Sequence, residues 1–403
     1  MWAAPWVGVL VSVLNGVAMR ETDAPALTRV LTFGVEEEFL LVGGVTGETV
    51  SRAGALLAQA GEHPWATGGG GYHAELFDTQ LESATGTCTE LADLRHQLRL
   101  ARGHLAGVAE GAGLRLLSTG TPVLRGRLPA VASDERFARI LGMHAGLVAD
   151  YQSCGCHVHV GVADRDTAVA VVNHLRPWLP TLLALSANSP FDRGKDSGYA
   201  SWRMIEQARF PGAGVPPWFA SAADHQRLVE RLVDCGVLAD TAMTFWLARP
   251  SARLPTVEIR AADAAATVDE AVLQAALTRA LVSTALADLA LGREAPRVDG
   301  SILAAAVWNA ARHGLEGPGV DPFEERPIPA AHLLRLLLAR VRPALEESGD
   351  LPEVTALLAG AERHGTGAVR QRRAAAGGLR AVVDLLATQT LCGTLTPEER
   401  QTP

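Results

Sequence analysis

One segment near the N-terminus carries most of the information in this chain: Thr32-Phe-Gly-Val-Glu-Glu-Glu-Phe-Leu-Leu-Val42. Aromatic and branched residues flank its glutamate triplet, a composition typical of a half-buried strand. Side chains alternate between the two faces of a strand, so Glu36 and Glu38 share one face and Glu37 takes the other. Like charges on one face repel each other unless a cation lies between them. Taken alone, the pattern is more typical of a solvated edge strand, and a divalent-metal site is the functional alternative.

Three later segments, each predicted to be a strand, also place charged or coordinating side chains two residues apart. Each single pair is weak evidence, and two histidines spaced in this way are often a core or surface pair. Four strands carrying acids, imidazoles and a guanidinium together predict one polar cavity lined by a sheet. A carboxylate-rich ligand set favours Mg²⁺ or Mn²⁺. The three pairs are Gln80 and Glu82, His157 and His159, and Glu258 and Arg260.

The alternation also predicts how individual acids are used. Glu36 and Glu38 should face the metals, whereas Glu37 should face the opposite side and tolerate replacement best. If residues 72–85 form one strand, Glu75 lies on the face opposite Gln80 and Glu82, unless the strand breaks near residues 77–78.

Composition and charge exclude several classes of protein. The 403 residues include 48% hydrophobic and 20% charged residues, which is ordinary for a globular protein. The net charge of −8 argues against a nucleic-acid or anionic-membrane surface. Five cysteines without a framework spacing fit a reduced, cytoplasmic compartment.

The chain divides into a strand-rich part and a helical part. Residues 1–30 are predicted to be an N-terminal extension, in which the apolar run 2–18 is short for a membrane span and indicates either a mis-assigned start or a flexible extension. Residues 31–390 are predicted to be a single catalytic domain, followed by a tail at 391–403. Strands fill the first two thirds, which predicts an α+β fold with a mostly antiparallel sheet. The last third, rich in Ala and Leu, predicts helices at 268–291, 301–313, 330–347, 351–363 and 366–388.

Two arginines add groups suited to an anionic ligand. Arg203 follows the loop Gly198-Tyr-Ala-Ser201, and Arg260 ends the strand that begins at Thr256. The planar guanidinium recognises carboxylate or phosphate through two hydrogen bonds. The alternative is that both arginines pair with local acids.

These segments together resemble the carboxylate-amine ligases of the YbdK type, in the second glutamate–cysteine ligase group of the glutamine synthetase-like superfamily. The resemblance runs from about Thr32 to about Arg373, and the order and spacing of its motifs make it specific. The motifs are Gly34-Val-Glu-Glu-Glu-Phe-Leu-Leu-Val42, Gly155-Cys-His-Val-His-Val-Gly161, Leu185-Ser-Ala-Asn-Ser-Pro190, Gly198-Tyr-Ala-Ser-Trp-Arg203, Pro255-Thr-Val-Glu-Ile-Arg260 and Gly365-Thr-Gly-Ala-Val-Arg-Gln-Arg372.

The resemblance implies a six-stranded antiparallel sheet curved into a cup that holds ATP, divalent metals and an amino acid. It implies that ATP phosphorylates the γ-carboxylate of glutamate and that an amine, such as that of cysteine, then displaces phosphate to form an amide. Glu75 is a weaker match to an acidic ligand, and His159 has no assured role. The matched metal ligands are Glu36, Glu38, Glu82, His157 and Glu258, the catalytic residues are Arg203 and Arg260, and the cofactor-binding residues are Arg203, Arg260 and Ser201.

Elementary chemistry supports the same reaction. A carboxylate is a poor electrophile until phosphorylation provides a leaving group, and phosphoryl transfer needs metal and cationic groups around the spreading negative charge. The sequence contains no P-loop motif. It departs from the family pattern at Leu247, where relatives usually have an acid, which leaves one polar contact in doubt.

Two other functions remain open from the sequence. A ligase-derived binding protein without turnover is suggested by Leu247, and a metal-dependent amidohydrolase is suggested by His157 and His159 alone. The later histidines that a hydrolase would need fall mostly in helical stretches. The expected partners are small-molecule amino acids and amines, without nucleic acid or membrane, and a homodimer is compatible with the exposed sheet edge or the Ala/Leu-rich helices.

Overall fold

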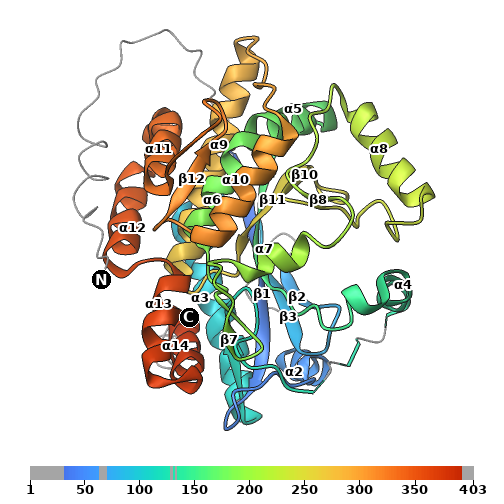
Figure 1. The fold of residues 1–403 in the computed structure, drawn as a ribbon, viewed down its shortest axis with the longest axis vertical. Helices are drawn as coiled ribbons and strands as arrows, with labels where there is room; N and C mark the ends of the chain where they lie inside the picture. The colour runs from blue at the N-terminus through green and yellow to red at the C-terminus, as the bar shows by residue number, and fades with distance from the viewer. Residues whose placement is uncertain (1–30, 63–69, 128–129, 132–133, 393–403) are drawn as a thin grey trace.

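The computed structural model describes residues 31–62, 70–127, 130–131 and 134–392. Its centre is a seven-stranded sheet in which every pairing is antiparallel, in the order β10-β11-β5-β1-β3-β2, with β4 also paired to β1 (Figure 1). The strands are β1 (Phe33–Gly43), β2 (Gly71–Ala74), β3 (Gln80–Ala84), β4 (Leu114–Leu117), β5 (Gly155–Gly161), β10 (Ala248–Pro250) and β11 (Thr256–Asp263). The predicted α+β class and antiparallel sheet are confirmed.

The predicted number of six strands is wrong, because the sheet has seven. β1 extends beyond β5, and its far end pairs with the additional strand, β4. β1 has 11 residues, and only residues 33–37 pair with β5. Residues 40–43 of β1 pair instead with β4, which continues the same edge. The seventh strand therefore satisfies backbone groups that β5 leaves free.

The predicted single strand over residues 72–85 breaks into two. The break lies at residues 75–79, where Asp78 N donates to Ala130 O (2.9 Å) and the Asp78 carboxylate accepts from Gly54 N (2.6 Å). The chain reverses there, so β2 and β3 become neighbouring antiparallel strands. This reversal determines where Glu75 lies.

The helical last third is confirmed, with one correction. The predicted helix at 366–388 is interrupted at residues 375–378, because Gly378 adopts a positive φ of 90° that ends the preceding turn. A two-stranded ribbon, β12 (Pro318–Asp321) with β13 (Arg326–Pro329), lies between two of the helices. The helices are α9 (Val268–Ala290), α10 (Gly300–His313), α11 (Ala330–Glu347), α12 (Leu351–His364), α13 (Gly367–Ala374) and α14 (Leu379–Leu391).

Further helices and strand pairs surround the sheet. They are α2 (Ala53–Ala60), α3 (Leu91–Gly111), α4 (Glu135–His144), α5 (Arg165–Leu175), α6 (Leu179–Ser186), α7 (Trp202–Gln207) and α8 (Ala222–Asp234), with β6 (Phe191–Asp192) paired to β7 (Lys195–Asp196) and β8 (Ala213–Gly214) paired to β9 (Phe245–Trp246). A 3₁₀ turn, Arg176–Trp178, separates α5 from α6 where Pro177 follows Arg176. The predicted extension at 1–30 and nearly all of the predicted tail lie outside the described residues.

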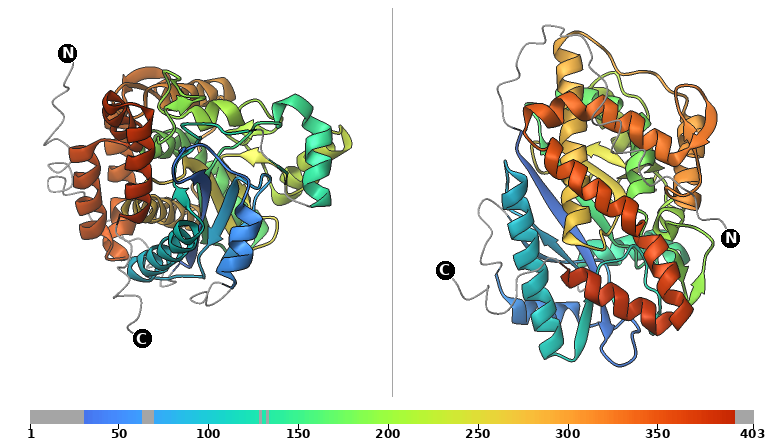
Figure 2. Two further views of the ribbon diagram at one scale, coloured as in Figure 1. Left: turned by 90° about the horizontal axis from the view of Figure 1, so that it is seen from below. Right: turned by 90° about the vertical axis from the view of Figure 1, so that its left-hand side faces the viewer.

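Helix α9 is the central helix of the core. It begins with a capping box between Thr267 and Glu270 and contacts β1 and β5. Figure 2 shows α9 on one face of the sheet together with α3 and the C-terminal helices. Among the described helices, α9 has the length and apolar composition of a membrane span, but 72% of its apolar window is buried within the fold.

The sheet separates an apolar face from an acidic one, as the alternation predicts. Phe33, Val35, Val158 and Val160 point into the hydrophobic core formed with α5, α6, α9 and α11. We call the opposite face, which carries Glu36, Glu38, Glu82, His157, His159 and Glu258, the acidic face.

Glu37 points to the helix-covered face, where it forms a buried ion pair with Arg102 of α3. Arg102 Nη2 donates to Glu37 Oε1 (2.6 Å) and Nε donates to Oε2 (3.0 Å), and the two residues are 0% and 1% exposed. Arg102 also donates to the carbonyls of Ala265, Ala266 and Thr390. The predicted orientation of Glu37 is confirmed, but its predicted tolerance of replacement is wrong, because its loss leaves a buried charge without a partner.

We expect Glu37→Gln to lower the free energy of unfolding by about 3–5 kcal/mol, because Arg102 would keep its charge in an apolar interior. Denaturant unfolding monitored by circular dichroism measures this change. Glu48→Gln, at an exposed position, is the matched control and should change stability by less than about 0.5 kcal/mol. Equal stability of the two variants would contradict a structural role for the ion pair.

Candidate active site

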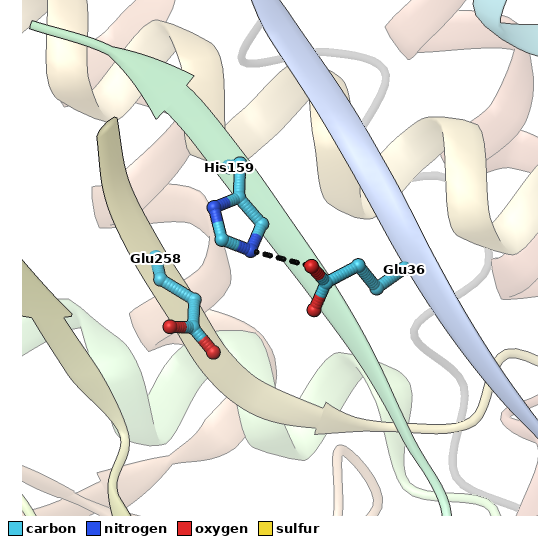
Figure 3. Close-up of side chains that lie close together, drawn as sticks. All are labelled: Glu36, His159 and Glu258. Carbon is cyan, nitrogen blue, oxygen red and sulfur yellow. Dashed lines mark ion pairs between the residues drawn. The ribbon is translucent and has the colours of Figure 1, made fainter. Parts of the chain in front are cut away.

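Three neighbouring strands bring the first group of candidate ligands together. The register places Glu36 of β1 opposite His157 of β5, and His159 of β5 opposite Glu258 of β11. Glu36, His159 and Glu258 project from these strands toward one another (Figure 3), with ligand atoms all within 4.8 Å. His159 Nε2 lies 3.2 Å from Glu36 Oε1, and His157 Nδ1 lies 3.5 Å from Glu36 Oε2. Histidine and carboxylate therefore alternate across the acidic face.

Two further groups of potential ligands overlap with the first. Glu36, Glu82 and His157 form one, while Glu38, Glu75 and Glu82 form the other, again within 4.8 Å. Glu38 is directly opposite Glu82 across β1 and β3. All five residues predicted as metal ligands are thus brought together. The complete cluster, which we call the carboxylate–imidazole cluster, is Glu36, Glu38, Glu75, Glu82, His157, His159 and Glu258.

Two members of this cluster had no firm role in the sequence analysis. His159 had a detectable signal, because it shares a strand face with His157. Glu75 had a weaker signal, a partial match to an acidic ligand, because its position depends on the chain reversal between β2 and β3. The acid at position 75 joins Glu38 and Glu82 only after that reversal.

Crowding of carboxylates changes their affinity for protons. Burial, followed by the charges of neighbouring glutamates, raises the pKa of Glu82 well above its ordinary value and that of Glu75 to about 8. Burial also tends to raise the pKa of Glu36, but hydrogen bonds and charge from His157 and His159 outweigh it and lower that pKa. The Glu38–Glu75–Glu82 side of the cluster therefore needs added positive charge, which protons or a bound cation can supply.

Glu258 is held from two sides by guanidinium groups. Arg249 of β10 donates from Nε (2.8 Å) and Nη2 (3.2 Å) to the two carboxylate oxygens of Glu258, and Arg260 Nη1 donates to the same carboxylate. Burial tends to raise the pKa of Glu258, but Arg249 and Arg260 outweigh it and lower that pKa well below its ordinary value. Arg249 is not among the residues predicted from the sequence, although its strand directly precedes the Glu258 strand and the register places the two residues opposite each other.

Arg203 and Ser201 lie at the start of α7, beside the cluster. Ser201 caps the helix by accepting from Met204 N and donates to Asp263 Oδ1 (2.8 Å). Both partners of the Ser201 hydroxyl therefore lie within the fold. Its predicted cofactor-binding role stays a prediction. Arg203 Nη2 donates to Arg260 O (3.2 Å), which joins the two predicted catalytic arginines.

Gly155 allows Arg203 and His157 to approach the same point of β5. Its N–H donates to Glu38 Oε2 (2.6 Å). A Cβ at this position would lie 2.5 Å from Arg203 Nη2 and 2.8 Å from His157 Nε2. The glycine of this motif is therefore required by the close approach of two site residues.

The site contains buried polar atoms suited to both a cation and an anion. His157 Nε2 is buried and has no hydrogen-bond partner among the described residues, and the same is true of Arg203 Nη1 and Arg260 Nε. Imidazole nitrogens among carboxylate oxygens fit a divalent cation, and the oxygen-rich set fits Mg²⁺ or Mn²⁺. These guanidinium donors fit an anionic group beside it, although Arg203 Nη1 also lies 3.9 Å from Asp263 Oδ1.

Leu247, which departs from the expected acid, belongs to the hydrophobic core. It is fully buried among residues packed on the helix-covered side. Its carbonyl accepts from Arg260 N (2.8 Å), so its backbone still positions a residue of the site. The departure therefore places an apolar side chain in the core and leaves the carboxylate–imidazole cluster complete.

Known proteins share both the sequence and the fold of this chain. The model of glutamate–cysteine ligase family 2 matches residues 32–384. A protein of Saccharopolyspora erythraea named "Putative glutamate--cysteine ligase 2-2" is 54% identical over 364 residues, which cover 90% of this chain and 93% of that protein. "Putative glutamate--cysteine ligase 2" of Salinispora arenicola is 44% identical over 376 residues, covering 92% and 97%.

Solved structures of lower sequence similarity share the fold. The glutamate–cysteine ligase of Francisella tularensis, in complex with AMP, has a TM-score of 0.69 at 13% identity and covers 91% of this chain and 90% of that one. A bifunctional glutathione synthetase of Pasteurella multocida has a TM-score of 0.65 at 16% identity, covering 90% of this chain and 52% of that one. These likenesses show that the chain shares its fold with both ligases. Because the family model and the sequence relatives span most of its length, the chain belongs to glutamate–cysteine ligase family 2.

Proposed function

We propose that this protein is an ATP-dependent carboxylate-amine ligase that joins the γ-carboxylate of L-glutamate to an amine, with L-cysteine as the first candidate. The observation that carries the proposal is the carboxylate–imidazole cluster, beside which guanidinium nitrogens of Arg203 and Arg260 have no hydrogen-bond partner in the described part of the chain. A cation site next to an anion site is what transfer of a phosphoryl group to a carboxylate requires. Family membership supports the same reaction.

The proposed reaction has two balanced steps. A γ-carboxylate oxygen of glutamate forms a bond to the γ-phosphorus of ATP, while the bond from that phosphorus to the bridging oxygen breaks and ADP leaves. The amine nitrogen then attacks the activated carbonyl carbon, phosphate leaves, and the nitrogen loses its proton. A divalent cation would neutralise the phosphate oxygens and orient them for transfer.

The residues of the chain have distinct proposed roles in these steps. Glu36, Glu38, Glu82, His157 and Glu258 would hold Mg²⁺ or Mn²⁺, and Glu75 and His159 complete the ligand groups. Arg203 and Arg260 would donate to oxygens on which negative charge develops during phosphoryl transfer. Arg249 positions Glu258 by a two-point hydrogen bond.

The alternatives have less support. His157 and His159 lie between carboxylates of an antiparallel sheet, which removes the reason for proposing an amidohydrolase. A binding protein without turnover was suggested by Leu247, whose side chain belongs to the core. We propose that residues 31–390 form one catalytic unit that acts in the cytoplasm on small molecules. We also propose that the protein can form a homodimer, which size-exclusion chromatography with light scattering tests.

The reaction is tested by ADP release from purified protein with Mg²⁺, ATP, glutamate and a panel of amines. We expect metal-dependent ADP together with a γ-glutamyl amide detected by mass spectrometry. Nucleotide binding without turnover would favour the binding protein, and amide hydrolysis without ATP would favour the hydrolase.

Glu82→Gln should reduce the rate of ADP formation by about 100-fold or more, because a cluster member loses its charge. The metal-free protein should keep its melting temperature, because burial and neighbouring glutamates already favour the neutral form of Glu82. Glu110→Gln, at an exposed position of α3, is the matched control and should retain full activity. Near-normal activity of Glu82→Gln would remove the metal-site model.

The pH dependence of stability should depend on Glu75. Burial and neighbouring carboxylates raise its pKa from 4.5 to about 8, so the folded protein retains a proton that the unfolded chain releases. The stability of the metal-free protein should therefore fall as pH rises from about 4.5 to about 8, and added Mg²⁺ should restore more stability at high pH. Thermal unfolding of wild type and Glu75→Gln across this range measures the effect. Parallel pH profiles for the two proteins would contradict it.

A further inference from the structure

A cavity lies at the edge of the sheet, beside β10 and outside the carboxylate–imidazole cluster. It has a volume of about 120 Å³. Arg165 of α5, His225 of α8, Thr244 and Arg249 of β10 line it. These elements lie together at the right of the molecule in Figure 1. The space suits a group of a few non-hydrogen atoms.

His225 is an unsatisfied polar group in the wall of this cavity. His225 is only 6% exposed, and neither ring nitrogen has a hydrogen-bond partner among the described residues. The ring is held edge-on against Phe219 and Trp246, with centroids 5.1 and 5.5 Å away. A buried imidazole without partners is costly, so a ligand or water must meet it.

The charge around the cavity favours an anion. Two arginines line it, and none of the described residues that line it carries a carboxylate. Arg165 uses one nitrogen to donate to Ser251 O (3.3 Å), and further N–H groups of its guanidinium remain for a ligand. Burial, followed by the charges of Arg165 and Arg249, lowers the pKa of His225 to about 4, against a smaller opposing effect of Asp224. The ring is therefore neutral near pH 7 and offers one N–H donor.

Arg249 connects this cavity to the candidate active site. Its Nε and Nη2 hold Glu258, while its Nη1 donates to Thr244 Oγ1 (3.2 Å) and to the carbonyls of Ala242 and Thr244. Because Thr244 Oγ1 accepts from Arg249, its own O–H remains available to donate into the cavity. A bound anion would attract Arg249 and compete with Glu258 for it.

We propose that this cavity is a binding site for a small oxyanion, phosphate or carboxylate, that contacts His225, Arg165 and Thr244. Occupancy of the site changes how firmly Arg249 holds Glu258, and thereby changes turnover. Binding itself does not depend on the proposed ligase function, whereas the effect on turnover rests on it. Phosphate and carboxylate differ in shape and charge, so separate titrations distinguish them.

The test follows the imidazole resonances of His225 by NMR during separate titrations with inorganic phosphate and acetate, with sodium chloride at equal ionic strength as the reference. A saturable shift with phosphate alone identifies a phosphate site, and one with acetate as well identifies a general oxyanion site. No saturable shift with either would mean that the cavity holds water only and would overturn the proposal.

Variants separate this site from the candidate active site. Arg165→Gln, at an exposed position, should weaken binding by about tenfold or more, since it removes a charge-assisted hydrogen bond. Arg253→Gln, an exposed arginine nearby that does not line the cavity, should bind as wild type does. Glu82→Gln should leave the His225 shift unchanged even where it abolishes ADP formation, so failure of the ligase proposal remains distinguishable. Equal binding by Arg165→Gln and wild type would overturn the assignment.

Discussion

The buried ion pair between Glu37 and Arg102 is the constraint on which the architecture depends. It joins β1 to α3, and the remaining donors of Arg102 reach carbonyls beside α9 and in α14. A guanidinium in an apolar interior is tolerated only when its donors are satisfied, so this pairing strongly disfavours other registers of β1. Shifting β1 by one residue would turn Glu37 toward the acidic face and remove Glu36 and Glu38 from it. The ion pair behind the sheet therefore helps to hold the acids in front of it.

The two faces of the sheet treat charge in opposite ways. Behind the sheet, one carboxylate meets one guanidinium and five hydrogen bonds leave Arg102 satisfied. On the acidic face, Glu38, Glu75 and Glu82 lie together, and burial with mutual repulsion raises the pKa of Glu75 and Glu82. The first arrangement stabilises the fold, whereas the second leaves crowded carboxylates that need a proton or a bound cation. A ligase that binds a metal ion and phosphate groups at one site can use these carboxylates as metal ligands.

Arginines divide the acidic face into regions of different character. Glu258 is neutralised by Arg249 and Arg260, whereas the Glu38 side of the cluster faces fewer cations. Arg249 belongs to the edge strand of the sheet and also lines the cavity beside β10 that contains His225. The edge strand thus provides a physical connection from a surface cavity to a residue of the site. Leu247, two residues earlier, keeps this strand anchored in the core.

Strand periodicity alone was sufficient to group Glu36 with Glu38, His157 with His159 and Glu258 with Arg260, because alternation is a local property of an extended chain. The antiparallel class and the C-terminal helices also followed from local patterns. Local patterns did not indicate which distant residues pair with Glu37 or lie beside Glu75. Glu37 and Arg102 are 65 residues apart, and Glu75 reaches Glu38 only through the reversal between β2 and β3. Contacts of this kind depend on packing between distant segments, which leaves no periodic signal, so only the tertiary structure decided which acids are neutralised and which remain to bind a cation.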